Sequence, residues 1–474
     1  MSSMKHYARS RAWCEWPDFE QWAAAASLAV ADPDAAALSP FLLLSLPGIS
    51  AAQQRACATR WMAARLLASA PDRAELAAEF AAATARDIAA TAAAALLPID
   101  APVRKIRLGY LSCDFHQHAT ALLMVEMLEA HDGERFELHD YSYGADDGLG
   151  MRQRLHASFH QFTDITALTD KQAARAIHAD GIDILIDLKG YTAGTRTALL
   201  MYRPAPLQVS FLGYPGTLGG AWCDYLVSDR FVTPASAAAD YSEALACLPH
   251  SYQPHGGPAQ IGPAPTREAA GLPEQGLVLC CFNQAYKFTP EVFDIWCGLL
   301  DRNPGSVLWL LRNEQAEGNL RVEAMQRGIA PHRLVFAPDL PQAEHLARLQ
   351  LADLVLDTSP YNAHTTASDA LWAGVPLVTC AGDTFASRVA GSLLHAVGLA
   401  ELVTHTLDDY AELAHALAAD PGRLHTLRTK LADQRQLAPL FDVAAYTMSL
   451  EALYGAMWAR HLAGLAPEAV GDGG

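Results

Sequence analysis

The chain has 474 residues, of which 51% are hydrophobic, so it is long enough to bury more than one hydrophobic core. Its 34 Lys and Arg residues against 52 Asp and Glu residues give a net charge of −18. A surface this acidic excludes nucleic acid and anionic membranes as partners of the surface as a whole, and any anionic ligand must be held by a local group of residues.

The N-terminal stretch has no apolar segment of the kind that directs export, and no later stretch is long and apolar enough to span a membrane. The nine cysteines are scattered and include no C-x-x-C pair, which favours reduced thiols over disulfides or a zinc site. We therefore expect a cytoplasmic protein with no membrane partner. The sequence does not predict an oligomeric state.

Residues 1–102 are rich in alanine and have helical spacing, as in "RWMAARLLASA" and "AELAAEFAAATARDIAATAAAALL". We found no repeat of about 34 residues, the length typical of helical-pair arrays. These residues are predicted to form a small helical cap.

Residues 103–250 alternate short apolar runs with helical segments, which is typical of βαβ units and a parallel sheet. A Pro-, Gly- and His-rich stretch, 251–276, reads as a linker, after which the alternation resumes in 277–474. The predicted fold class is α/β, with two Rossmann-like domains facing a cleft and an N-terminal α-helical extension. Such sheets bind ligands beyond the carboxyl ends of their strands.

The stretch "PYNAHTTASDALWAG", 360–374, follows a predicted strand and should start a helix. Helix N-termini present free N–H groups and a partial positive charge, which suit a phosphate. Thr365 and Thr366 would add hydroxyl donors, and Asp369 could bind a ribose diol. The alternative is purely structural, because Thr366-x-x-Asp369 also fits a capping box that merely starts a helix.

Lys287 lies between a predicted strand and a helix start formed by Thr289, Pro290 and Glu291. There it could neutralise a diphosphate leaving group, with Gln284 beside it in the same loop. The alternative is a solvated surface lysine.

Two further candidates come from histidines. His345 and Arg348 are spaced to lie on one helix face, where they could contact a base and an anionic group or form an ordinary polar face. His116 and His118 follow the first predicted strand, where a histidine could act as a general base or simply lie in a loop. His-x-His alone does not indicate a metal, because no third ligand of suitable spacing follows.

Several motifs in one order identify a resemblance to a known family. They include "RLGYLSCDFHQHAT", "RPAPLQVSFLGYPGT", "FNQAYKFTPEVFDIW", "PYNAHTTASDALWAGVPLVT" and "APLFDVAAYTMSLEALYGAMW". From about Lys105 to Trp458 the chain resembles the catalytic region of the protein O-linked N-acetylglucosamine transferases and their bacterial relatives. The resemblance implies a GT-B fold with an acceptor-side first lobe and a UDP-sugar-side second lobe. It also implies inverting, metal-independent sugar transfer from a UDP-sugar to a protein, without a cofactor.

The resemblance also assigns roles. The catalytic residues would be His118 near the acceptor hydroxyl, Lys287 at the diphosphate, and His178 in support. The residues that bind the UDP-sugar would be Gln284, Gln342, His345, Arg348, Tyr361, His364, Thr365, Thr366 and Asp369. The acceptor proton would go either to His118 or to an oxygen of the donor phosphate.

This chain departs from the animal enzymes at two of these positions and in its overall length. Gln342 stands where they have a Lys beside the base pocket, and Tyr361 replaces a Cys close to the N-acetyl group of the donor. The long tetratricopeptide array and the large domain inserted between the lobes have no counterpart here. The sugar could accordingly be GlcNAc, glucose or another hexose.

We considered four functions in descending order. The first is a UDP-sugar-dependent glycosyltransferase acting on protein Ser and Thr hydroxyls, and the second is an Asn-directed protein glucosyltransferase of the same superfamily. The third is a UDP-sugar epimerase, which needs no acceptor protein, and the fourth is a UDP-sugar-binding scaffold without turnover.

Overall fold

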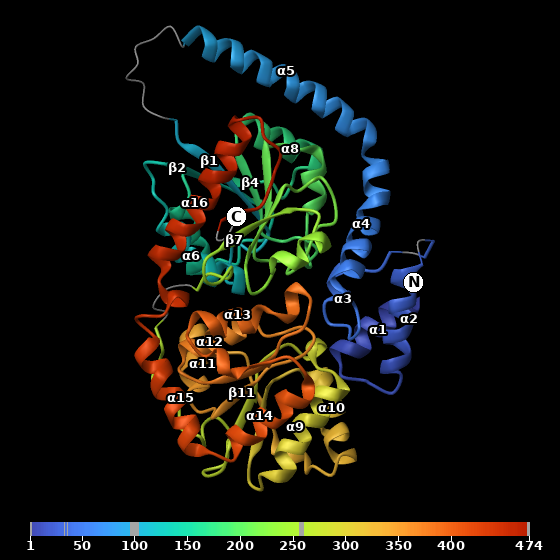
Figure 1. Ribbon diagram of the computed structural model, residues 1–474, viewed down its shortest axis with the longest axis vertical. Coiled ribbons are helices and arrows are strands. Elements are labelled where there is room, and N and C mark those ends of the chain that lie inside the picture. Colours follow the sequence, from blue (N-terminus) through green and yellow to red (C-terminus); the bar gives the residue numbers. More distant parts are fainter. Residues whose placement is uncertain (1, 33, 36, 95–103, 256–259, 472–474) are drawn as a thin grey trace. The chain divides into compact units, whose positions relative to one another are not determined.

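The computed structural model describes residues 2–32, 34–35, 37–94, 104–255 and 260–471. The chain divides into two compact units, each built on a parallel sheet (Figure 1). Unit 1 comprises Met1–Leu38, Leu42–Gln53 and Gly257–Asp442, and unit 2 comprises Ser39–Phe41, Gln54–Gly256 and Val443–Gly474.

Unit 2 contains a sheet in the strand order β14-β7-β6-β5-β4-β1-β2-β3, and every described pair in it is parallel. Its central strands are almost entirely buried, as expected of a parallel sheet covered on both faces. The strands are β1 Ile106–Ser112, β2 Phe136–Ser142, β3 Gln161–Asp164, β4 Ile184–Asp187, β5 Leu207–Ser210, β6 Tyr225–Asp229, β7 Ala244–Leu248 and β14 Val470–Gly471.

The helices that connect and cover this sheet include one from the end of the chain. They are α6 Ala119–Glu129, α7 Gly150–Ser158, α8 Asp170–Ala179 and α16 Val443–Leu462. Helix α16, at the red end of the chain in Figure 1, packs against α6 and β7. Its buried Glu451 accepts a hydrogen bond from the backbone N–H of Asp132 at 2.7 Å and contacts His131 Nδ1 at 2.9 Å.

Unit 1 contains a second parallel sheet in the order β10-β9-β8-β11-β12-β13, which is the doubly wound Rossmann order. Its strands are β8 Val278–Cys281, β9 Val307–Leu311, β10 Leu334–Ala337, β11 Leu354–Leu356, β12 Leu377–Cys380 and β13 Val403–Thr404. Its helices are α9 Pro290–Arg302, α10 Glu314–Gln326, α11 Gln342–Leu349, α12 Thr365–Trp372, α13 Val389–Ala396, α14 Leu407–Ala418 and α15 Pro421–Gln434.

The helix start predicted after Lys287 is confirmed. Thr289 is the N-cap of α9, its hydroxyl accepts the Val292 N–H at 3.3 Å, and Pro290 occupies the first helical position. This start fixes the end of the loop that carries Lys287, because the N-cap side chain satisfies a helix N–H that would otherwise need water.

The N-terminal part of the chain is helical, as predicted from its alanine spacing. It consists of α1 Ser2–Ala12, α2 Phe19–Ala31, α3 Pro40–Leu43, α4 Ala51–Ala68 and α5 Ala70–Ala94. The end of the predicted cap, 95–102, lies outside the described residues.

The observed division of the chain differs from the predicted bounds at two places. The predicted cap, 1–102, is shared between the two units. Residues 443–474, predicted to belong with 277–442, pack instead with unit 2, because α16 covers its sheet and β14 pairs with β7. The boundary between Gly256 and Gly257 falls inside the predicted linker, 251–276.

Two predictions from the composition concern the thiols and the membrane. The nine cysteines all lie within the described residues, none of them forms a disulfide, and eight are buried. Within the same residues, none of the helices has the length and apolar character needed to cross a membrane.

Candidate functional site

Lys287 is a buried lysine at the carboxyl end of β8. It ends the short 3-10 turn η3, Ala285–Lys287, and only 7% of the residue is exposed. Its ammonium group donates a hydrogen bond to the backbone carbonyl of Asn362 at 2.8 Å and lies 3.8 Å from the centroid of the Tyr361 ring. Burial lowers the pKa of Lys287 to about 8, against the opposing attraction of Asp357. The solvated-lysine alternative is therefore wrong.

Asp357 organises the loop that runs from β11 to α12. Its carboxylate accepts hydrogen bonds from the backbone N–H groups of Thr358 at 2.7 Å and Ala363 at 2.6 Å. The Thr379 hydroxyl donates to it at 2.6 Å and the Asn283 amide at 3.3 Å. Burial raises the pKa of Asp357 to about 6, and these hydrogen bonds oppose the rise. The carboxylate thus holds both ends of the loop that supplies the carbonyl bound by Lys287.

The start of α12 settles the alternative raised by the Thr366-x-x-Asp369 pattern. The N-cap is His364, which makes no side-chain capping bond, so the predicted capping box is not formed. The Thr366 hydroxyl instead donates to Asn283 Oδ1. The first intrahelical bonds come from the N–H groups of Ala367 and Ser368, both to the His364 carbonyl, so the two threonine N–H groups precede the helical ladder.

His364 is a neutral side chain beside this helix start. Burial and the charge of Lys287 hold its pKa well below the usual histidine value. Its Nε2 lies 3.3 Å from the Ala386 carbonyl, and since a carbonyl only accepts, the hydrogen is on Nε2. His364 therefore adds a dipole, but no charge, next to Lys287.

His345 and Arg348 lie together on α11, as their spacing predicts. An Arg348 Nη donates to His345 Nδ1 at 2.9 Å, so the hydrogen of the neutral imidazole is on Nε2. That Nε2 faces Asp369 Oδ2 at 3.9 Å, too far for a hydrogen bond. Burial lowers the pKa of His345 to about 4 and raises that of Asp369 to about 7, so the two do not form an ion pair near neutral pH.

The same part of unit 1 contains a narrow pocket. It is lined by Cys280, Cys281, Phe282, Asn283, His345, Leu349, Val355, Ala363 and Thr366. Gln342 is the first residue of α11 and is half-buried, whereas Gln284 is exposed at the start of η3. Unit 1 therefore brings the predicted donor residues to the carboxyl ends of β8 and β11, the switch point of its sheet.

Unit 2 carries a buried ion pair at the corresponding place. Lys189, after β4, donates to Asp114, after β1, at 2.7 Å, and both side chains are less than a tenth exposed. Neither residue was among the predicted site residues. The signal was present, because Lys189 in "IDLKG" follows a strand just as Lys287 does.

His118 lies beside this pair as the N-cap of α6. Its Nδ1 accepts the Thr120 N–H at 3.2 Å and lies 3.5 Å from Asp114 Oδ2. Burial lowers its pKa from the usual value, so the ring is neutral at pH 7. In this tautomer the hydrogen is on Nε2, and His118 as it stands is a hydrogen-bond donor rather than a base.

His178 is not brought to this group, contrary to its predicted supporting role. It lies in the last turn of α8, just before β4 begins, and hence at the amino edge of the sheet. Its ring stacks on Phe80 of α5 with centroids 3.9 Å apart, and its Nδ1 lies 3.3 Å from the Pro204 carbonyl. The side chain therefore serves the packing between α5 and α8.

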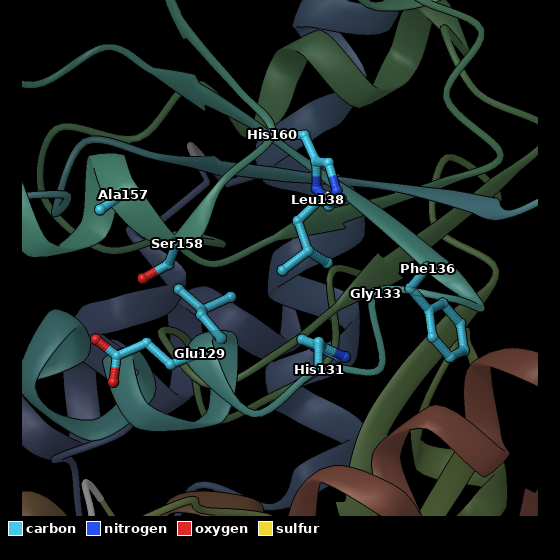
Figure 2. A pocket seen from close by; sticks show the side chains of 9 residues that line it. Glu129, His131, Gly133, Phe136, Leu138, Ala157, Ser158 and His160 are labelled. Atoms are coloured by element: carbon cyan, nitrogen blue, oxygen red, sulfur yellow. Dashed lines mark hydrogen bonds between the residues drawn. The ribbon is translucent and has the colours of Figure 1, made fainter.

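A pocket in unit 2 also lies at the amino edge, away from Asp114. Figure 2 shows it between the ends of α6 and α7, with His131 and His160 among the labelled residues. Leu138 and Phe136, at the start of β2, complete its wall. Its position separates it from the carboxyl-end residues of the same sheet.

Comparison with known proteins identifies the class to which this fold and these residues belong. Glycosyl transferase family 41 matches residues 80–256 and 258–450, and the chain belongs to this family. Its fold class is that of the GT-B glycosyltransferases, and a sucrose-phosphate synthase from Thermosynechococcus elongatus shares it at 12% identity and a TM-score of 0.50, over 75% of this chain and all of that one.

More similar proteins narrow the comparison within the family. A solved mutant of the Thermobaculum terrenum O-GlcNAc transferase matches with a TM-score of 0.69 and 33% identity, over 76% of this chain and 69% of that one. The probable UDP-N-acetylglucosamine–peptide N-acetylglucosaminyltransferase SEC of Arabidopsis thaliana is 40% identical over 77% of this chain and 38% of its own length. The Caenorhabditis elegans UDP-N-acetylglucosamine–peptide N-acetylglucosaminyltransferase is 31% identical over 76% and 41%. The chain thus spans about two fifths of the curated relatives it matches.

His178→Ala should leave ligand binding at the carboxyl ends unchanged, because the ring lies at the opposite edge of the sheet. It should lower the stability of unit 2 by about 1–3 kcal/mol through the lost stacking on Phe80. Denaturant unfolding and isothermal titration with UDP measure the two effects. A UDP affinity reduced tenfold or more, with stability unchanged, would return His178 to the site.

Proposed function

We propose that the chain transfers N-acetylglucosamine from UDP-N-acetylglucosamine to Ser and Thr hydroxyls of proteins, with inversion at the anomeric carbon and without a metal. The names of the relatives support the donor and the protein acceptor. The observation that carries the proposal is the junction of Lys287 with the α12 start: its ammonium group binds the carbonyl of Asn362, two residues before the N-cap.

This junction offers what a departing diphosphate needs. As the bond from sugar to phosphate breaks, negative charge grows on the β-phosphate. The Lys287 ammonium and the Thr365 and Thr366 N–H groups would meet that charge in surroundings largely closed to water, where such contacts are stronger than in solution. Gln284, exposed at the start of η3, would contact the same diphosphate.

The remaining donor residues would bind the nucleoside and the sugar. The neutral His345 ring would stack on the uracil, Arg348 would lie beside it, and Gln342 would border the base. Asp369 would accept hydrogen bonds from the ribose hydroxyls. Tyr361 and His364, whose ring centroids are 5.1 Å apart, would lie next to the sugar.

Lys287→Ala should reduce sugar transfer about 100- to 1,000-fold, as the loss of one oxyanion donor does. Peptide mass spectrometry of a lysate incubated with the protein and UDP-GlcNAc or UDP-glucose would measure it. We expect a gain of one N-acetylhexosamine on Ser or Thr, unchanged by EDTA. Transfer of hexose to Asn, or no transfer beside measurable UDP binding, would contradict the proposed donor and acceptor.

UDP binding should weaken as pH rises through about 8, where Lys287 loses its proton. Its folded pKa is lowered to about 8, so the ammonium is present below that pH and is lost above it. Above pH 8 each further unit should raise the dissociation constant for UDP about tenfold, until the pKa of the bound form is reached. Isothermal titration between pH 8 and 9.5 tests this, and Lys287→Met should show no such slope. Equal slopes for both proteins would show that another group titrates.

For the acceptor proton, the geometry of His118 favours an oxygen of the donor phosphate as base. Asn, like His118 here, can cap a helix and donate a hydrogen bond, but it cannot take up a proton. His118→Asn should therefore keep transfer within about tenfold of the parent rate, whereas loss of a general base lowers rates 100- to 10,000-fold. The transfer rate in single-turnover assays decides between the two bases.

A further inference from the structure

The N-terminal helix α1 packs directly on η3, the turn that carries Lys287, within the same compact unit. The Arg11 guanidinium donates a hydrogen bond to the backbone carbonyl of Tyr286, the residue before Lys287. The Cys14 thiol lies 3.6 Å from the carbonyl of Ala285, the first residue of the turn. Two successive carbonyls of η3 are therefore contacted from α1 and the residues that follow it.

Arg11 is an unusual residue for packing alone. It is only 1% exposed, and its Nε and Nη1 have no hydrogen-bond partner among the described residues. Its guanidinium stacks on the Phe19 ring, with the central carbon 5.0 Å from the centroid. Burying a cation is costly unless its contacts compensate, and the hydrogen bond from Nη2 to the Tyr286 carbonyl is such a contact.

The end of α1 is also held from a second direction. Asn319 and Asn313, of α10 and its N-cap, donate to the carbonyls of Trp13 at 2.8 Å and Ala12 at 3.4 Å. Cys14, buried and in the left-handed region with φ of 52°, turns the chain away after the helix. Since α10 fixes the helix end, Arg11 approaches η3 from a fixed support.

We propose that Arg11 is a positioning residue for Lys287, holding η3 so that the ammonium group stays against the Asn362 carbonyl. The turn has only three residues, and its own hydrogen bonds run from the Lys287 and Phe288 N–H groups to Gln284 and Ala285. Burial favours withdrawal of the Lys287 charge toward water, and so short a turn offers little resistance of its own. The consequence for sugar transfer rests on the proposed function, whereas the positioning does not.

The first test is hydrogen exchange of the unliganded protein in several variants. Arg11→Met should speed exchange of the Lys287 and Phe288 N–H groups about tenfold, because the turn loses its external hydrogen bond. Arg11→Lys, which keeps a buried donor, should restore part of the protection. Asn319→Ala loosens α1 on the α10 side and controls for weaker docking, and Arg9→Met controls for loss of an exposed arginine on α1. Exchange in η3 that is unchanged in Arg11→Met, or equally fast in Asn319→Ala, would overturn the proposal.

The second test is a double-mutant cycle on UDP binding, measured by isothermal titration. Arg11→Met should weaken UDP binding about tenfold in the parent protein and have no further effect in Lys287→Met, because it acts through that lysine. Additive losses would overturn the proposal. If the parent binds UDP but transfers no sugar, the proposed function fails while the cycle still decides the role of Arg11. If the parent does not bind UDP, the exchange measurement decides it alone.

Discussion

The burial of the Lys287 charge is the constraint on which the rest of the candidate site depends. An ammonium group removed from water needs compensating contacts, and here they are a carbonyl, an aromatic face and a nearby carboxylate. Two of them, the Asn362 carbonyl and the Tyr361 ring, belong to the loop that Asp357 fixes by accepting the N–H of Ala363. The conformation of that loop and the position of the lysine therefore depend on each other, and the same loop leads into the first N–H groups of α12.

Each sheet places polar groups where its strand order reverses. In unit 1 the Asn283 amide, after β8, donates to Thr358, after β11, at 2.8 Å. In unit 2 the Lys189 and Asp114 pair joins the ends of β4 and β1. Connections leave such a switch point in opposite directions, so the strand ends there are not covered by a crossing helix and a ligand can approach. The two units thus follow the same rule with different chemistry, one with a cation that can meet an anion and the other with an internally neutralised pair.

The sequence predicted the elements well because their signals are local. Alternating apolar runs and helical spacing indicated two parallel sheets, and the Thr289-Pro290 pair indicated the start of α9. It did not predict that α16 returns to the first sheet, because the spacing of apolar residues shows that a helix has a buried face but not which sheet covers it. The motif residues around Lys287 and α12 were found for a similar local reason, since both follow strands directly.

The residues that were missed or misplaced depend on contacts between distant parts of the chain. His178 was predicted beside the site because its motif lies within the family resemblance, yet the direction of α8 puts it at the opposite edge of the sheet. Arg11 gave no signal, because its partner is a backbone carbonyl 275 residues away. A side chain that binds a backbone group leaves no complementary residue type in the sequence, so only the folded chain reveals it.

Tyr361 gives a physical meaning to one departure from the animal enzymes, which have a Cys at this place. A thiol offers an ammonium group no aromatic face, whereas the Tyr361 ring lies 3.8 Å from Lys287 Nζ. A desolvated contact of this kind stabilises the charged form by about 2 kcal/mol. It opposes the burial that lowers the pKa of Lys287 to about 8, a value at which most of the lysine is still charged at neutral pH. The larger residue thereby keeps the lysine both buried and cationic, the combination in which an ammonium group stabilises a leaving diphosphate most strongly.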